Sequence, residues 1–295
     1  MKQFCRAHRG GVLSAAVLVV LGGALAAGLW LRGGGEALPA SGQLDQQGVP
    51  VPILMYHSIL ESPGTENKYV ISAQTFREDL QYLKDQGYTA IFIADLIAYA
   101  DQGTPLPQKA VIITIDDGML NNLSYALPIL EELDMKAVVS VVGRFSEIST
   151  EHPDPNPYYA HLTWEDVRTL DASGLIEVGN HTYQMHELEG RRGCTQKQGE
   201  SEAQYQQALR QDIGKLQDLL AQYAGVVPNV FCYPYGFISP ASLPVLKEMG
   251  FRAALSCNEK VNYITGDPEQ LYCLNRFNRP SGISTESFMR GVLPA

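Results

Sequence analysis

Two adjacent carboxylates follow a strongly apolar run of the sequence. Asp116 and Asp117 come directly after residues 109–115, KAVIITI, whose β-branched composition is typical of a strand buried on both faces. Neighbouring acids at the end of such a strand repel each other unless a cation or a shared proton relieves the repulsion. Taken alone, an Asp-Asp-Gly sequence is explained more simply by a solvated turn in which one Asp caps a helix. A metal-binding or catalytic interpretation of Asp116 and Asp117 therefore requires further ligands or reactive groups elsewhere in the chain.

Histidines at other strand ends are candidates for those partners. His181 and His186 bound the segment HTYQMH after an apolar strand at 175–179, and two imidazoles five residues apart can meet at one metal if the segment turns. Zinc takes His and carboxylate ligands, and its catalytic sites keep a position for water. His57 ends the apolar run VPILMYH, where a lone histidine is usually structural. Residues 231–236, FCYPYG, form a further strand-end turn that is rich in aromatic residues.

The segments around these clusters alternate between strand and helix. Such alternation predicts an α/β fold of parallel strands joined by helical crossovers, with the reactive groups at the strand ends. Ser72 and Thr163 are expected helix caps, the latter with Asp166 at capping-box spacing. The expected strands lie at 51–57, 109–115, 137–143, 175–179 and 229–236, the helices at 72–87, 120–134, from 163, 201–224 and 239–249, and long surface loops at 147–160 and 189–203.

The first fifty residues have a different character. Residues 1–9 are basic, and residues 10–32 are almost uninterruptedly apolar, which is long enough to cross the ~30 Å hydrocarbon core as a helix. The basic residues upstream favour a cytoplasmic N-terminus, so we expect a single-pass signal anchor with the rest of the chain outside the cytoplasm. Cleavage after an Ala-Leu-Ala sequence, which would release a secreted form, is the alternative. Residues 33–49 are expected to be a flexible linker and residues 50–295 the folded domain that carries the candidate catalytic residues.

Composition narrows the possible partners. The formal net charge of -10 and the sequence pI near 5.1 argue against a nucleic-acid partner, because such a surface repels phosphate backbones. Four cysteines lie beyond the apolar run and could form disulfides outside the cell, but their pairing and the oligomeric state cannot be read from the sequence: Cys194, Cys232, Cys257 and Cys273.

In combination, these clusters resemble the polysaccharide deacetylase (NodB-homology) family from about Val51 to Phe288. Residues 114–118, TIDDG, are similar to the family's TFDDG motif, which implies that Asp116 is the catalytic base and Asp117 a metal ligand. The segment from His181 to His186 is similar to the motif that supplies two metal-binding histidines. The resemblance implies a single domain folded as a distorted (β/α) barrel.

The third motif of the family is similar to Tyr233–Gly236. It implies that Pro234 and Tyr235 form a wall of the groove and that a backbone N–H near Tyr235 stabilises the oxyanion.

Three departures from the family pattern point to a subgroup. The histidines are five apart rather than four, Cys232 stands where an Arg is common, and the stretch from Leu274 to Arg276 lacks the usual acid His. These features resemble the poly-N-acetylglucosamine deacetylases, in which the His of an N-terminal MYH segment is the general acid. The resemblance makes His57 that acid, and we expect Arg276 to orient Asp116 in place of the missing Arg. The chain also resembles membrane-tethered Gram-positive homologues.

The implied function is metal-dependent hydrolysis of N-acetyl groups on an amino-sugar polymer of the cell envelope. The expected cofactor is a divalent metal, most simply Zn²⁺, with Co²⁺, Ni²⁺ or another first-row ion as alternatives. Peptidoglycan and N-acetylglucosamine polysaccharides are both candidate substrates, and the membrane is an expected partner through residues 10–32. The rival functions are an O-acetyl esterase on the same fold and a non-catalytic glycan-binding module of the envelope.

Overall fold

A computed structural model describes residues 48–62, 64 and 67–294, which belong to one compact unit, Gln47–Ala295. The predicted segments 1–9 and 10–32 and nearly all of the linker 33–49 lie outside the described residues. Within the described part of the chain, no helix combines the length and the apolar character needed to cross a bilayer.

The expected α/β architecture of parallel strands is confirmed. Seven strands follow one another across the main sheet in the order β10-β9-β8-β7-β6-β2-β12, every pairing along this path is parallel, and β5 pairs with β6. The strands of the sheet are β2 (Ile53–Tyr56), β5 (Thr89–Ala90), β6 (Ala110–Ile115), β7 (Ala137–Val141), β8 (Ile176–Asn180), β9 (Val230–Cys232), β10 (Ala253–Leu255) and β12 (Phe277–Asn278). Two small pairs lie beside it, namely β1 (Val49–Val51) with β11 (Asn262–Ile264) and β3 (Ser58–Leu60) with β4 (Val70–Ser72).

The sheet curls into a half-barrel rather than a regular closed barrel. One chain segment reaches both of its ends, because Leu274 bridges to Leu255 of β10 and β12 pairs with β2. Arg276 lies between these two contacts. The short link between the ends of the sheet therefore fixes the backbone on both sides of Arg276.

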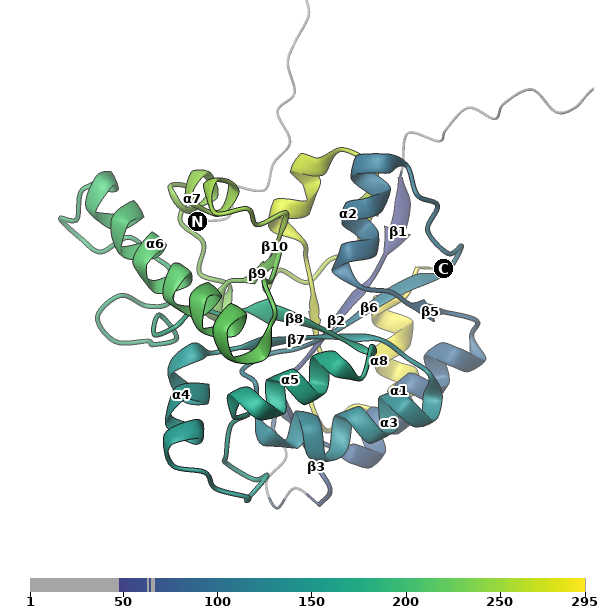
Figure 1. The fold of residues 1–295 in the computed structure, drawn as a ribbon. Coiled ribbons are helices and arrows are strands. Elements are labelled where there is room, and N and C mark those ends of the chain that lie inside the picture. Colours follow the sequence, from purple (N-terminus) through teal and green to yellow (C-terminus); the bar gives the residue numbers. More distant parts are fainter. Residues whose placement is uncertain (1–47, 63, 65–66, 295) are drawn as a thin grey trace, which may run out of the picture. The chain divides into compact units, whose positions relative to one another are not determined.

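Helices surround the curled sheet (Figure 1). They are α1 (Ala73–Asp85), α2 (Ile93–Gln102), α3 (Leu127–Leu133), α4 (Gly143–Glu151), α5 (Trp164–Ala172), α6 (Glu202–Leu219), α7 (Ser242–Glu248) and α8 (Thr285–Val292), with π-helical turns at Asn122–Ala126 and Leu220–Ala224 and 3-10 turns at Pro234–Gly236 and Pro268–Cys273. Both predicted caps are confirmed, since Ser72 accepts a hydrogen bond from the Thr75 N–H and Thr163 forms a capping box with Asp166. The loop predicted at 147–160 is wrong in its first part, because α4 continues to Glu151. Only Gly143 and Ser146 of α4 are buried, so the helix has almost no apolar face to mark it in the sequence.

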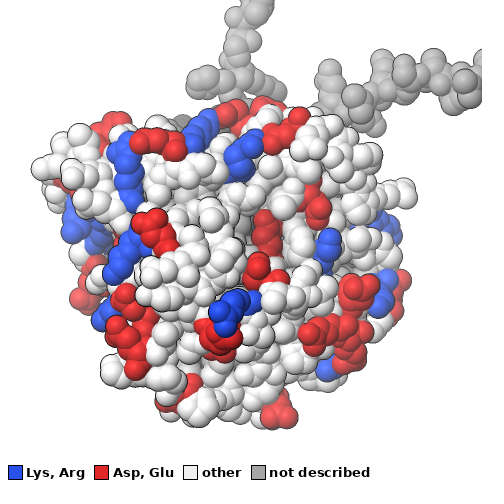
Figure 2. Space-filling view, in the orientation of Figure 1, with Lys and Arg blue, Asp and Glu red and all other residues white. Residues whose placement is uncertain are grey.

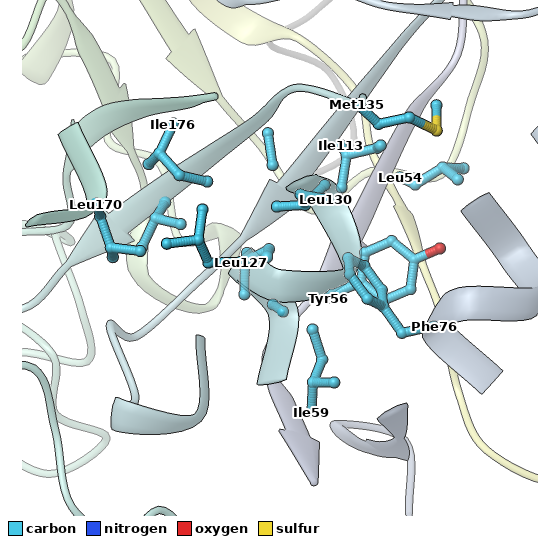
Figure 3. Close-up of a cluster of buried hydrophobic side chains, with 14 of the residues drawn as sticks. Leu54, Tyr56, Ile59, Phe76, Ile113, Leu127, Leu130, Met135, Leu170 and Ile176 are labelled. Atoms are coloured by element: carbon cyan, nitrogen blue, oxygen red, sulfur yellow. The ribbon is translucent and has the colours of Figure 1, made fainter. Parts of the chain in front are cut away.

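The core has two main layers because alternate strand residues face opposite sides. On β6, Val111, Ile113 and Ile115 pack outward against the helices, as in the cluster of Figure 3, where the labelled Ile113, Tyr56 and Leu130 lie together. Ala110 and Ile112 of the same strand face the inside of the curl. Figure 2 shows acidic and basic side chains interspersed over the visible face of the molecule rather than gathered into one patch.

A half-buried acid at the opposite end of the sheet from the candidate site residues gives a pH prediction. Glu177 of β8 accepts hydrogen bonds from the N–H groups of Ile93 (2.7 Å) and Ala94 (3.3 Å) at the start of α2. Burial raises the pKa of Glu177 to about 7, although these N–H groups act in the opposite direction. The pKa of Glu177 is higher in the folded protein than the ordinary value of 4.5 expected in the unfolded chain, so the folded protein binds this proton more tightly. The free energy of unfolding therefore falls as the pH rises from 4.5 through about 7.

We therefore expect Glu177→Gln to stabilise the protein at pH 8, by on the order of 1–3 kcal/mol, and to have little effect near pH 4.5. Urea unfolding at the two pH values measures this difference. Glu189→Gln, at an exposed position, serves as the matched control. An equal effect of Glu177→Gln at both pH values would contradict the assignment.

Candidate active site

The inward-facing strand residues carry the candidate site at the carboxyl ends of the sheet. Continuing the alternation of β6 past Ala110 and Ile112 places Thr114 and then Asp116 on the inner side, and Asp116 is 2 % exposed. By the same rule Cys232 ends the inner row of β9 and His181 follows Gly179 of β8. Parallel strands bring these ends to one edge (Figure 1).

Asp116 is held by a two-pronged ion pair with Arg276. The guanidinium Nη1 and Nη2 atoms each lie 2.8 Å from one carboxylate oxygen, and both side chains are buried. Arg276 also donates to the Ser256 carbonyl (2.8 Å) and to the Thr114 hydroxyl (3.1 Å). A buried guanidinium with this many partners has one orientation, so it fixes the rotation of the Asp116 carboxylate.

The charge of Asp116 follows from the same contacts. Burial by itself raises the pKa of this carboxyl, but the Arg276 guanidinium and His181 outweigh it and lower the pKa to about 2. Cys232 adds a thiol contact, with its Sγ 3.4 Å from Asp116 Oδ2 and 3.2 Å from Arg276 Nη2. Asp116 is therefore ionised at every physiological pH.

We expect Arg276→Lys to reduce turnover by about 10²-fold, because a lysine offers a point charge and cannot hold both carboxylate oxygens. Steady-state kinetics measures the loss, with Arg290→Lys as an exposed control. Normal turnover of Arg276→Lys would show that the orientation of Asp116 does not depend on the guanidinium.

Asp117 meets two imidazoles. Its Oδ1 lies 3.1 Å from His186 Nε2 and 3.5 Å from His181 Nε2, yet this buried oxygen has no contact of hydrogen-bond geometry. The ligand atoms of the three residues all lie within 4.8 Å of one another. Burial raises the pKa of Asp117, but the two imidazoles more than offset it and hold the pKa well below its usual range. An ionised oxygen facing two ring nitrogens is a donor set that fits a divalent cation.

The backbone at this position is held in an uncommon conformation. Asp117 has φ 74° and the next residue, Gly118, has φ 64°, both in the left-handed region. A Cβ atom at Gly118 would lie 2.9 Å from Val141 Cγ1, so the close approach of β7 requires glycine here. Left-handed non-glycine residues are concentrated at functional sites, because the surrounding structure must compensate their strain.

Each histidine of the pair has a partner for its second nitrogen. His181 Nδ1 lies 2.8 Å from the Cys232 carbonyl oxygen, so this nitrogen carries the proton and Nε2 is left as a ligand. His186 Nδ1 lies 3.3 Å from the Tyr235 hydroxyl, and the two rings pack with centroids 4.6 Å apart. Tyr235 has φ 58° and lies in the 3-10 turn Pro234–Gly236, where Pro234 is buried.

His57 follows the inner row of β2. Its ring packs against the Tyr69 ring with centroids 4.8 Å apart, and its buried Nδ1 has no hydrogen-bond partner among the described residues. Burial lowers the pKa of His57, while the nearby charges of Asp116 and Asp117 act to raise it. The structure thus places His57 within electrostatic reach of both acids.

The structure brings the sequence candidates together around one edge of the sheet. Direct contacts join Asp116 to Arg276, Asp117 to the two histidines, and His186 to Tyr235. Pro234 contributes to the turn that carries Tyr235. The catalytic and binding roles of these residues remain predictions.

Several residues at the site were not identified from the sequence. The His161 ring packs at a tilt against Phe145, with centroids 4.4 Å apart, and Phe145 makes an edge-type contact with His186 at a centroid distance of 6.0 Å. Asn122 donates to the His57 carbonyl (3.1 Å) and so holds the MYH segment against the chain that follows Asp116. Asn122 lies four residues after the Asp-Asp-Gly sequence, but its partner His57 is 65 residues away, so the contact leaves no local signal.

Three of the cysteines for which disulfides were considered are free thiols. They are Cys194, Cys232 and Cys257. Cys232 and Cys257 both lie beside Arg276, so they line the site instead of crosslinking the fold.

Comparison with known proteins assigns the class. The sequence matches the polysaccharide deacetylase family over residues 103–254, which is about half of the chain, and the chain belongs to this family.

Individual relatives refine this placement. The chain is 25% identical over 219 residues to the poly-beta-1,6-N-acetyl-D-glucosamine N-deacetylase of Escherichia coli K12, covering 67% of this chain and 32% of that protein. It thus spans about a third of the length of this relative. Among solved structures, a de-N-acetylase from Aggregatibacter actinomycetemcomitans superposes with a TM-score of 0.69 at 23% identity, covering 82% of this chain and 99% of that one. IcaB from Ammonifex degensii gives a TM-score of 0.65 at 25% identity, with coverages of 83% and 96%.

Proposed function

We propose that this protein is a metal-dependent deacetylase that releases acetate from the N-acetyl groups of an N-acetylglucosamine polymer of the cell envelope. The observation that carries the proposal is the pairing of a fixed, ionised carboxylate, Asp116, with the neighbouring three-residue donor set of Asp117, His181 and His186. A glycan-binding module would need neither the buried ion pair nor the converging ligand atoms.

Asp117, His181 and His186 would hold the cation. A divalent ion held there would polarise a carbonyl group and lower the pKa of a bound water molecule towards ~7. Zinc is the proposed ion, because two imidazoles and a carboxylate are among its usual catalytic ligands. Co²⁺ and Ni²⁺ suit the same donor set.

Two residues beside the metal ligands would carry the two proton transfers, Asp116 as the base and His57 as the acid. Asp116 accepts the proton of the attacking water on a carboxylate oxygen, and Arg276 keeps that carboxylate ionised and oriented. A carboxylate with a pKa of about 2 is a weak base, so it depends on a water molecule whose own pKa has been lowered. A backbone N–H near Tyr235 would stabilise the oxyanion, and such a donor contributes ~2.7–4 kcal/mol. His57 would protonate the departing amine.

Acetate release by the purified chain tests this proposal. The assay compares β-1,6-linked N-acetylglucosamine oligomers, peptidoglycan fragments and an O-acetylated sugar, each with Zn²⁺ or Co²⁺ and with a chelator, beside an Asp116→Asn variant. Metal-dependent release from an N-acetylated substrate that disappears in the variant supports the proposal, and the preferred polymer defines the pathway. Release from the O-acetylated sugar alone would identify an esterase. Tight metal binding with no acetate from any substrate would favour the glycan-binding module.

We also propose that the catalytic domain lies outside the cytoplasm, tethered to the cell membrane by residues 10–32. The basic segment 1–9 followed by this apolar run supports the proposal. Protease treatment of intact, wall-stripped and permeabilised cells, followed by immunodetection of the domain, tests it. Protection in both intact and wall-stripped cells would place the domain inside.

A further inference from the structure

The segment between the two site histidines wraps around one carboxylate of a distant helix. Asp212 of α6 accepts the Tyr183 N–H on Oδ1 and the Gln184 N–H on Oδ2, each at 2.9 Å, and the Met185 N–H interacts with the same side chain. Three successive backbone donors therefore converge on a single acid. These three residues lie between His181 and His186, so the carboxylate forms the centre of the turn that separates the two imidazoles.

Helix α6 holds this carboxylate in a fixed place. Its buried residues, including Leu209, Ile213 and Leu216, pack into the hydrophobic core. The helix is also hydrogen-bonded to the end of β8 just before the turn, because Asn180 donates to the Ile213 carbonyl (3.2 Å) and to the Gln217 side chain (3.1 Å). Asp212 thus connects helix α6 to the turn that carries His186.

The two histidines depend on the turn to different degrees. His181 follows β8 directly, its N–H bonds to the Val141 carbonyl (3.0 Å), and its ring is oriented by the Cys232 carbonyl. The ring of His186 lies at the far end of the turn, and its contacts are to side chains: Asp117 at 3.1 Å, the Tyr235 hydroxyl at 3.3 Å and the Phe145 ring. The backbone position of His186 therefore depends on the path of residues 182–185, which Asp212 holds.

We propose that Asp212 is a positioning residue for the metal site, which sets the turn so that His186 reaches the cation held by Asp117 and His181. This inference rests on the metal site of the proposed function. It also accounts for the five-residue spacing of the histidines, because the turn needs enough residues to pass around the Asp212 carboxylate.

Asp212→Asn tests the proposal with little change in size. The amide keeps one oxygen acceptor but replaces the other with an NH₂ donor that faces a backbone N–H, so one of the hydrogen bonds that hold the turn is lost. Titration of Zn²⁺ into the metal-free full chain by calorimetry should show an affinity weaker by about 10–100-fold, as for other residues that orient metal ligands. Asp218→Asn, an exposed acid on the same helix, should bind Zn²⁺ as the wild type does. The visible spectrum of the Co²⁺-loaded variant should shift, which loss of stability alone does not produce.

A double-mutant cycle separates positioning from a general structural role. If Asp212 acts through His186, Asp212→Asn should weaken Zn²⁺ binding in the wild-type background and have no further effect in the His186→Ala background. An unchanged Zn²⁺ affinity in Asp212→Asn, or an equal loss in both backgrounds, would overturn the proposal. If Asp212→Asn does not fold, Asp212→Glu, which keeps both acceptors but displaces them, should still weaken binding, and wild-type affinity in it would overturn the proposal. Absence of Zn²⁺ binding by the wild type would instead reject the metal site of the proposed function.

Discussion

Asp117→Ala should abolish metal binding and acetate release together. The substitution removes the ionised oxygen on which both imidazoles converge and leaves two histidines as the remaining ligands. A catalytic cation supplies several kcal/mol of charge stabilisation, so we expect turnover to fall by at least ~10³-fold. Metal content after dialysis and acetate release from the same preparation measure the two losses.

Asp116→Asn is the informative comparison for this result. It should retain the metal, because Asp116 is engaged by Arg276, yet it should lose turnover because the amide cannot accept the proton of water. Asp218→Ala controls for the loss of an acid at the surface. Full metal occupancy in Asp117→Ala would contradict the ligand assignment, and loss of metal from Asp116→Asn would mean that both acids are ligands.

The convergence of the site was predictable from strand alternation and the family motifs. The inward-facing residues of β6 run from Ala110 through Thr114 to Asp116. Once KAVIITI was assigned to a strand, the alternation of its side chains placed Asp116 on the same face as Ala110. The same alternation places His181 inward. Adjacent acids at such a strand end point in different directions, which is why Asp116 meets Arg276 whereas Asp117 meets the histidines.

Other features depend on contacts between distant segments and left no local signal. Asp212 and Asn122 are polar residues of helical segments, and each acquires its role only when a loop of another element docks on it. The helix α2 was missed although Ile93, Leu96 and Ile97 follow a helical period. The second half of α4 was taken as a loop because this helix buries only Gly143 and Ser146 and so lacks an apolar period. Local patterns thus specified the inner faces of the strands, whereas the residues that support the ligands depend on tertiary packing.

His57→Ala should lose most of the amide hydrolysis while it keeps the metal. Among the described residues, no hydrogen bond or ring contact joins His57 to the three ligand residues, and its ring is supported by Tyr69 and its backbone by Asn122. General-acid catalysis typically contributes ~10²–10⁴-fold in rate, so turnover on an N-acetylated oligomer should fall by that factor. Zinc affinity measured by calorimetry should stay at the wild-type value.

The leaving group provides the decisive control, because an acid matters only when the departing atom needs a proton. An amine cannot leave as its anion, whereas nitrophenolate can, so His57→Ala should hydrolyse nitrophenyl acetate at nearly the wild-type rate. His152→Ala, an exposed histidine at the end of α4, should leave both reactions unchanged. Equal losses on amide and ester would mean that His57 acts on an earlier step, such as binding the sugar or orienting the water. Near-normal amide hydrolysis would assign the acid to another group at the site, and His161, whose ring lies beside Phe145 and within electrostatic reach of Asp117, would be the next residue to replace.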